Sequence, residues 1–211
     1  MRDKSKDNKK HWDFKKELKR KGIHLLSLLF LLSYVFCGSV WGKKIALLLL
    51  TFLLILFLEI DFIRIKTKIK IPSFINSLYR EKEKNRLGGH VYFLIGAIIA
   101  LAIFNFKIAL VALLMTTFGD IAASLIGVKF GKHWLKKIPN TAWEGIIAEF
   151  TVDLIIGFIF LPHWILVLVM ALTATFVETV FTHADDNMLI PIFSGFNGQI
   201  TLMILDYFNM I

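Results

Sequence analysis

Cysteine is almost absent from this chain of 211 residues, in which Cys37 is the only one. A single thiol excludes an intramolecular disulfide framework and a metal site built from cysteines. A secretory signal should have a shorter charged region than the basic N-terminal 22 residues and a small-residue cleavage site after its apolar part. The start of the chain therefore predicts an uncleaved first membrane span. Internal repeats are also missing, as is any low-complexity tract beyond the lysine-rich start.

Apolar residues dominate what is present. They make up 56% of the chain, whose mean hydropathy is +0.66, more apolar than a soluble domain normally is. Seven apolar runs approach the roughly 20 residues that cross the hydrocarbon core of a bilayer. The sequence thus predicts an all-α polytopic membrane protein with about seven transmembrane helices, at residues 23–42, 44–63, 91–106, 107–128, 145–161, 164–182 and 190–210.

The basic residues predict the orientation, because cytoplasmic loops carry an excess of lysine and arginine. With the N-terminus in the cytoplasm, 22 of the 25 basic residues lie on that side. We therefore expect a basic cytoplasmic segment over 1–22 and a single transmembrane domain over 23–211, whose cytoplasmic loops are 64–90, 129–144 and 183–189. In the first of these loops, basic and mostly apolar residues alternate over 64–71, which predicts a short surface strand or an interfacial segment.

The fourth apolar run has a face of small residues. Gly119, Ala123, Gly127 and Gly131 recur at every fourth position, which lets a second helix approach closely. Close packing alone leaves Asp120 unexplained, because an acidic residue inside a span is costly and normally pairs with a cation or lines a polar interior.

A phosphate site would account for Asp120. Ser124 lies one turn further along the same face, and four lysines follow: Lys129, Lys132, Lys136 and Lys137. A carboxylate, a hydroxyl and nearby lysines can together hold a magnesium-bound polyphosphate. The alternative is that Asp120 only pairs or caps within the helix-packing face.

Other polar residues lie near the same predicted membrane face. Glu178 precedes Asp185 by seven residues, and both carboxylates suit a second contribution to a metal site. Glu149 and Asp153 are four residues apart on one helix face and could line a polar cavity. Three residues at the start of the first span are either a topogenic cluster or contacts for a phosphate: Arg20, Lys21 and His24.

Four segments of the chain resemble one enzyme family. The pattern Gly-Asp-x-x-Ala-x-x-x-Gly-x-x-x-Gly from Gly119, continuing to Trp143-Glu144-Gly145, is similar to the signature of the CTP-dependent lipid-alcohol kinases. These are dolichol kinase, phytol kinase and the yeast-type diacylglycerol kinase, with phosphatidate cytidylyltransferases more distantly related. The other three segments occur in the family's order, at Glu17–His24, at Arg80–Glu83 with Gly89–Gly96, and at Val177–Glu178 with Asp185–Pro191.

The resemblance implies an integral membrane kinase that transfers the terminal phosphate of CTP, with Mg²⁺, to the hydroxyl of a lipid alcohol. It implies that Asp120, Asp185 and Asp186 hold the metal, and that Glu178 acts with them in catalysis. The lipid or phosphate contacts would be Arg20, Lys21, His24 and Asn187. The expected nucleotide contacts are Gly119, Ser124, Gly127, Lys129, Lys132, Lys136, Lys137, Glu144 and Gly145.

One position departs from the family pattern. The family places a lysine and then Ser or Thr before the aromatic-Glu-Gly triplet, whereas this chain has Thr141 and Ala142. Either Lys136 or Lys137 reaches the same phosphates on its flexible stem, or activity is impaired.

Two alternatives to the kinase stay open. One is a cytidylyltransferase that forms a CDP-lipid, although its longer Lys-Arg…Lys-Asp…His-Gly-Gly…Asp-Arg pattern is missing. The other is a small transporter or scaffold, although paired spans broken by Pro or Gly are missing. We expect a nucleoside triphosphate and a membrane lipid as partners and no nucleic acid. The choice of alcohol and the oligomeric state do not follow from the sequence.

Overall fold

The structure is a computed structural model, and it describes residues 18, 21–22, 24–67, 86–135, 138, 141–181 and 184–210. Within these residues the fold is all-α. Its seven long helices are α2 (Ser27–Trp41), α3 (Lys43–Thr67), α5 (Gly89–Ile103), α6 (Phe106–Phe130), α7 (Trp143–Phe160), α8 (Trp164–Val180) and α9 (Asp186–Tyr207). Three of them, α3, α6 and α9, are long and apolar enough to cross a membrane, and α2, α5 and α8 are shorter apolar helices.

The all-α fold class is confirmed, and the described residues form seven long helices, as many as the predicted spans. Two details differ from the prediction: the strand, one of the two alternatives for 64–71, and the start of the last helix. Arg64–Thr67 form the last turn of α3, so the alternating pattern there is not a strand; residues 68–71 lie outside the described part. The last helix begins at Asp186 rather than at residue 190, because the Asp185 side chain caps it by accepting a hydrogen bond from the backbone N–H of Asn187.

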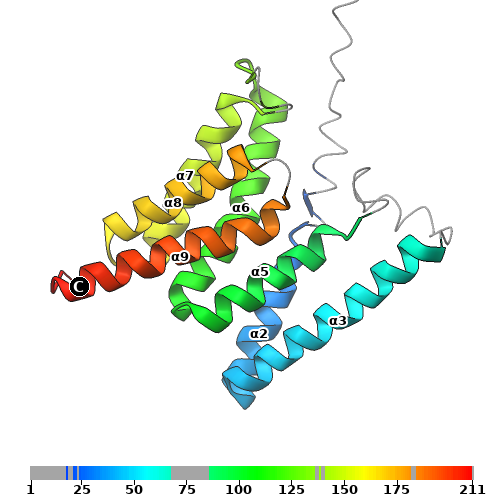
Figure 1. The fold of residues 1–211 in the computed structure, drawn as a ribbon. Helices are drawn as coiled ribbons and strands as arrows, with labels where there is room; N and C mark the ends of the chain where they lie inside the picture. The colour runs from blue at the N-terminus through cyan, green and yellow to red at the C-terminus, as the bar shows by residue number, and fades with distance from the viewer. Residues whose placement is uncertain are drawn as a thin grey trace, which may run out of the picture.

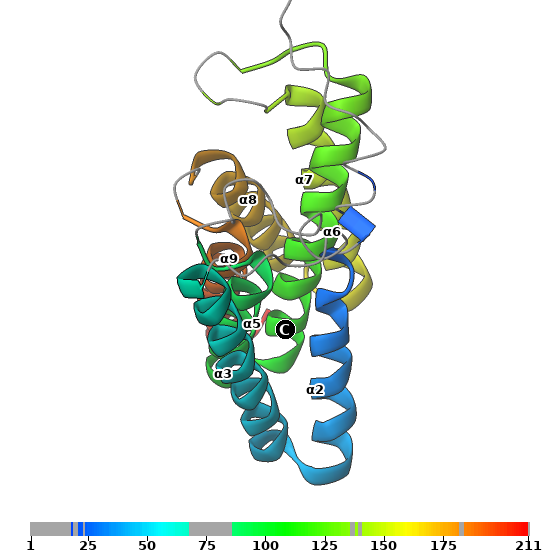
Figure 2. The ribbon, with the colours of Figure 1, turned by 90° about the vertical axis from the view of Figure 1, so that its right-hand side faces the viewer.

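The helices form two groups that share α5. Helices α2 and α3 pack as an antiparallel hairpin joined at Gly42, whose φ of 89° favours glycine. Helices α6 to α9 pack around one another, and α5 lies between α3 and α9 (Figures 1 and 2). Helix α6 contacts α5, α7, α8 and α9, so its side chains reach most of the interior.

Helices α6 and α7 pack backbone to backbone on the small-residue face that the sequence predicted. A Cβ atom on Gly145 would lie 2.7 Å from the carbonyl oxygen of Ala123 and 3.4 Å from the Cα of Gly127. A Cβ on Gly119 would lie 2.7 Å from Oδ1 of Asp153. The two backbones approach this closely because neither side places a bulky residue between them.

Gly145→Ala should therefore destabilise the protein. Its methyl group would meet the backbone of Ala123, which cannot rotate away, and overpacking of this kind costs about 1–3 kcal/mol. Over most of that range the cost exceeds the roughly 1 kcal/mol that alanine gains over glycine in a helix. We expect the melting temperature in detergent to fall by several degrees. Gly38→Ala is the matched control, since its methyl would make only an ordinary 3.6 Å contact with Ala46; equal melting temperatures for the two variants would contradict this account.

A buried carboxylate joins α3 to the start of α5. Asp61 accepts hydrogen bonds from Nε of Arg64 (2.9 Å) and from the backbone N–H of Gly88 (2.7 Å). Helix α5 then packs against the first turns of α9, where a Cβ on Gly96 would lie 2.9 Å from the carbonyl oxygen of Asn187. The ion pair between Asp61 and Arg64 and the hydrogen bond from Gly88 thus help to fix the helix that supports α9.

Candidate active site

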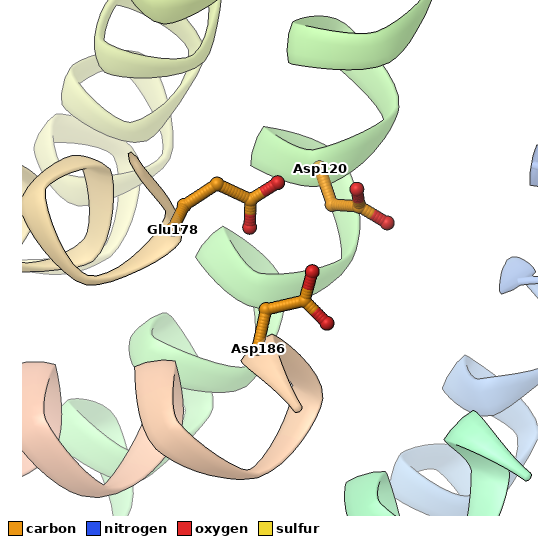
Figure 3. Close-up of side chains that lie close together, drawn as sticks. All are labelled: Asp120, Glu178 and Asp186. Atoms are coloured by element: carbon orange, nitrogen blue, oxygen red, sulfur yellow. The ribbon is translucent and has the colours of Figure 1, made fainter. Parts of the chain in front are cut away.

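Three carboxylates from three helices converge at one end of the bundle. Asp120 comes from α6, Glu178 from the last turn of α8 and Asp186 from the first turn of α9. Each offers an oxygen, and these three oxygens lie within 4.8 Å of one another (Figure 3). Like charges this close repel unless a cation or a proton intervenes. The group therefore has the composition and spacing of a cation site.

Asp120 is held in this position by the packing of α6. It lies in the C-terminal half of the helix and is only 5% exposed. The neighbouring Gly119 faces Asp153 of α7. Asp120 is the next residue along α6, and Figure 3 shows its carboxylate beside those of Glu178 and Asp186.

Asp185 and Asp186 have different partners although they are neighbours. Oδ1 of Asp185 accepts from the side-chain amide of Asn187 at 2.8 Å and from its backbone N–H at 3.3 Å. The same backbone N–H donates to Asp186 at 2.9 Å. The three carboxylates that lie together are Asp120, Glu178 and Asp186, whereas the resemblance implied Asp120, Asp185 and Asp186 as the metal ligands. Asp185 is the N-terminal cap of α9. Asn187 is buried and holds this turn together.

Two basic residues that precede the first long helix contact Asp120. The ammonium group of Lys21 forms an ion pair with Oδ1 of Asp120, and Nε2 of His24 lies 3.6 Å from Oδ2. Lys21 is only 2% exposed. The hydroxyl of Ser27 donates to the carbonyl of His24 at 2.6 Å, which fastens this turn to α2. Residues about 100 positions apart in sequence thus share one site.

A cavity of about 110 Å³ lies beside the carboxylates, between α6, α7 and α8. Glu178 belongs to its wall, so the cavity and the carboxylate group are continuous. Residues of the small face make room for it, and its lining includes Ser124, Gly127, Thr141, Gly145, Glu149 and Thr179. Three of the nucleotide contacts that the resemblance implied, Ser124, Gly127 and Gly145, therefore surround one space.

Glu149 was expected only to line a polar cavity, and it does so. It is 2% exposed and lies within electrostatic range of Glu178, Asp120 and Asp186. Asp153, one turn further on, is fully buried against Gly119, and neither of its oxygens has a hydrogen-bond partner in the described part of the chain. Their spacing of four residues was the sequence signal for this acidic wall.

The loop between α6 and α7 folds back on itself. The backbone N–H of Leu135 donates to the carbonyl of Thr141 at 2.9 Å, and that of Trp143 donates to the carbonyl of His133 at 3.0 Å. Nδ1 of His133 lies 2.7 Å from Oε1 of Glu144. Thr141, which pairs with Leu135, lies in the cavity wall. Glu144, which contacts His133, lies in the first turn of α7 and is not among the residues that line the cavity.

Not every predicted contact is brought to the cavity. Lys129 and Lys132 are exposed at the end of α6 and just beyond it. Lys129 lies over the ring of the adjacent Phe130, 5.1 Å from its centroid. Arg20, Lys136 and Lys137 lie outside the described residues, so their predicted contacts stay predictions.

Thr141→Lys should increase the affinity for a nucleotide. Thr141 lines the cavity, so a lysine there would add one ammonium group beside Glu149 and Glu178. A charge-assisted contact to a phosphate contributes roughly 1.4 kcal/mol or more, which corresponds to about a tenfold lower KM for CTP. Initial rates over a range of CTP concentrations would measure it, with Thr141→Met as the uncharged control of similar length. Loss of activity in the lysine variant alone would instead show that another lysine already serves this position.

The donor set fits a hard divalent cation. Mg²⁺ prefers oxygen ligands and is commonly bound through one or two carboxylates together with substrate phosphates. Asp120, Glu178 and Asp186 provide only carboxylate oxygens, and they leave room for a phosphate on the side of the cavity. Fold and site together describe a membrane protein with a polar site, suited to a metal-bound phosphate, at the ends of its helices.

The comparisons with known proteins agree with this class. The chain is 26% identical to CTP-dependent diacylglycerol kinase 1 of Schizosaccharomyces pombe over 212 residues, which cover 87% of this chain and 93% of that protein. It is 29% identical to CTP-dependent diacylglycerol kinase 1 of Saccharomyces cerevisiae over 159 residues, or 72% of this chain and 52% of that protein, about half its length.

A third relative comes from an archaeon. The chain is 32% identical to the uncharacterized protein MJ1137 of Methanocaldococcus jannaschii over 138 residues, which are 63% of this chain and 69% of that protein. No family model matches the chain, and no solved structure matches it. The chain belongs to the family of CTP-dependent lipid kinases.

Proposed function

We propose that this protein transfers the terminal phosphoryl group of CTP to the hydroxyl of a membrane lipid alcohol. The observation that carries the proposal is the convergence of Asp120, Glu178 and Asp186 next to a cavity lined by small and polar residues. Phosphoryl transfer depends on positioning and charge neutralisation more than on covalent chemistry by the protein. A carboxylate group flanked by basic residues suits that requirement.

The three carboxylates would hold Mg²⁺. When bound, the metal supplies positive charge to the phosphate oxygens of the nucleotide. Ser124, Gly127 and Gly145 would line the space for a phosphate group of the nucleotide, since the cavity they border has a volume of about 110 Å³. Lys21 and His24, which both contact Asp120, would also contact phosphate oxygens.

The reaction forms one bond and breaks another. The oxygen of the lipid hydroxyl bonds to the terminal phosphorus, the bond from that phosphorus to the bridging oxygen breaks, and CDP leaves. The proton of the hydroxyl passes to a carboxylate at the site. Glu178 is placed for this role, since it belongs both to the carboxylate group and to the cavity wall.

Among the candidate lipid substrates, we propose diacylglycerol in preference to a polyprenol or a phytol-like isoprenoid. The support is that the two yeast relatives cited above are named diacylglycerol kinases, and that one of them aligns over nearly its full length. A membrane-dissolved alcohol presents its hydroxyl at the interface, where the ends of α6, α8 and α9 would lie.

The site is proposed to face the cytoplasm in a multi-pass protein whose single catalytic domain spans 23–211. The support is the distribution of basic residues, 22 of 25 on the side of the site.

Cysteine accessibility tests this orientation. In a Cys37→Ala background, a cysteine at Lys132 should be shielded from an impermeant thiol reagent added to intact cells, whereas one at Lys107 should react. Lys132 follows α6 and Lys107 lies in its first turn, so the two positions are at opposite ends of the same helix. Both residues are exposed, so burial would not mask either position. Labelling at Lys132 but not at Lys107 would invert the orientation.

The direct test of the function uses two labels on CTP. Membranes that contain the protein should transfer label to diacylglycerol from CTP labelled on the γ-phosphate and not on the α-phosphate. Label from the α-phosphate in a lipid would instead indicate a cytidylyltransferase that forms a CDP-lipid. No lipid labelling from either nucleotide, across diacylglycerol, polyprenol and phytol, would favour a transporter or scaffold.

A further inference from the structure

Lys21 is a buried lysine beside Asp120, one of the three carboxylates of the site. Its ammonium is ion-paired with Oδ1 of Asp120, and the side chains of both residues are almost fully buried. Burying an ammonium is costly unless it is paired and its donors are used. The ion pair offsets this cost only in part, because in the described part of the chain the ammonium has no hydrogen-bond partner besides this ion pair.

An ammonium group has three donors, and phosphate oxygens are acceptors that suit them. Lys21 therefore has donors to offer to a phosphate that enters the site. Lys21 has more donors than partners, whereas Asp120 has two cations that compete for it. It is the partner of Lys21, and it is one of the three carboxylates placed to hold a metal ion. An ammonium and a divalent cation next to the same carboxylate repel each other.

Lys21 lies in a short turn that precedes α2. The backbone N–H of Leu25 donates to the carbonyl of Lys21, and then the chain turns before α2 begins at Ser27. A Cβ on the adjacent Gly22 would meet nothing within 4 Å. The ammonium of Lys21 stands at the end of a flexible four-carbon stem, so it can change partners by rotation of the side chain while the turn stays fastened to α2.

We infer that Lys21 is an exchangeable countercharge, which pairs with Asp120 in the metal-free protein and moves to a phosphate oxygen when a divalent cation takes Asp120. This inference rests on the proposed function and deepens it. The phosphate oxygen belongs to the nucleotide or to the phosphorylated lipid, which offer the same chemistry. Both ligands require the ion pair between Lys21 and Asp120 to break, the metal because it takes Asp120 and the phosphate because it takes Lys21. Whichever ligand binds first breaks the pair, so the second binds more tightly and the two are cooperative.

Chemical labelling of lysines tests the exchange on the full chain in detergent. The reactivity of Lys21 toward an acetylating reagent is measured by peptide mass spectrometry in four conditions: no ligand, Mg²⁺ alone, Mg²⁺ with a non-hydrolysable CTP analogue, and Mg²⁺ with phosphatidate. Lys43 and Lys107, both exposed and remote from the carboxylates, serve as internal references whose labelling should not change.

We expect Mg²⁺ alone to raise the labelling of Lys21 by about tenfold, in line with the usual strength of coupling between linked sites. Addition of a phosphate ligand should return it to the ligand-free rate. Protection by the CTP analogue assigns the contact to the nucleotide, and protection by phosphatidate alone assigns it to the lipid product. Labelling that Mg²⁺ does not change, or a rise that neither phosphate ligand reverses, would overturn the exchange.

Two variants separate the exchange from a purely structural role. Lys21→Met keeps the length of the side chain and removes its charge, so the folded protein should bind Mn²⁺ alone more tightly, by about tenfold, in a titration followed by electron paramagnetic resonance. Lys21→Arg keeps the charge and should bind Mn²⁺ like the original protein. Equal Mn²⁺ affinity for Lys21→Met and the original protein would contradict the exchange.

The outcome is distinguishable from failure of the proposed reaction. If γ-labelled CTP gives no labelled lipid but Lys21 responds to Mg²⁺ and to the CTP analogue as described, the exchange stands and the transfer reaction falls. If lipid is labelled while Lys21 does not respond, the reaction stands and the exchange falls.

Discussion

Asp120→Asn should reduce transfer from CTP to lipid by about a thousandfold, while the folded protein persists in detergent. Asparagine keeps the size of the side chain and part of its hydrogen bonding, but it removes the charge that would hold a cation with Glu178 and Asp186. Losing a metal-based charge stabilisation costs several kcal/mol in the transition state, and about 4 kcal/mol corresponds to a thousandfold in rate. The substitution also removes the ionic partner of Lys21.

The measurement is the transfer rate at saturating Mg²⁺ beside a melting curve of the same preparation. Asp206→Asn is the matched control, since it makes the same chemical change at an exposed position near the end of α9. Near-normal transfer by a well-folded Asp120→Asn protein would remove the carboxylate site from the proposal. A loss that appears only as a lower melting temperature would indicate that Asp120 is a packing and pairing residue, the structural role left open by its place beside the small face.

The sequence predicts the part of the site that local patterns encode. A repeat of small residues at every fourth position is sufficient to predict a close helix contact, and α6 and α7 make that contact at Gly127 and Gly145. An acidic residue in the middle of an apolar run is unusual enough to mark Asp120 by itself. Both signals lie within one helix, so they do not depend on which other helices are neighbours.

Contacts between distant segments could not be predicted in this way. Lys21 and Asp120 are 99 positions apart, and no periodicity links a basic cluster before the first span to an acid in the fourth. Without the family resemblance, the basic cluster was equally compatible with a topogenic role. Tertiary packing decides the matter, because α6 contacts most of the other helices and brings Asp120 to the end of the bundle where the chain first enters it.

The sequence also could not predict the residue at which the last helix begins. Asp185, Asp186 and Asn187 are all good helix-starting residues, so the pattern alone does not say which of them is the cap. The structure begins α9 at Asp186, and one residue of difference decides which carboxylate points toward Glu178 and which is used to cap the helix. This is why the resemblance could include both aspartates and the geometry separates them.

Asp186→Asn should accordingly lower the transfer rate by about a hundredfold or more, and Asp185→Asn should lower it by less than about tenfold, because asparagine is as good a helix cap as aspartate. Asp186 shares the carboxylate group with Asp120 and Glu178, whereas Asp185 accepts hydrogen bonds from Asn187. The Asp186 variant should also require more Mg²⁺ for half-maximal rate, a shift that a purely structural defect would not produce. The pair is matched in chemistry and adjacent in sequence, so folding defects of α9 would affect both variants. A Mg²⁺ titration of the two variants decides between the roles: a larger loss and a larger Mg²⁺ shift in Asp185→Asn would assign the metal to Asp185, as the resemblance implied, and would leave Asp186 as a residue of the helix start.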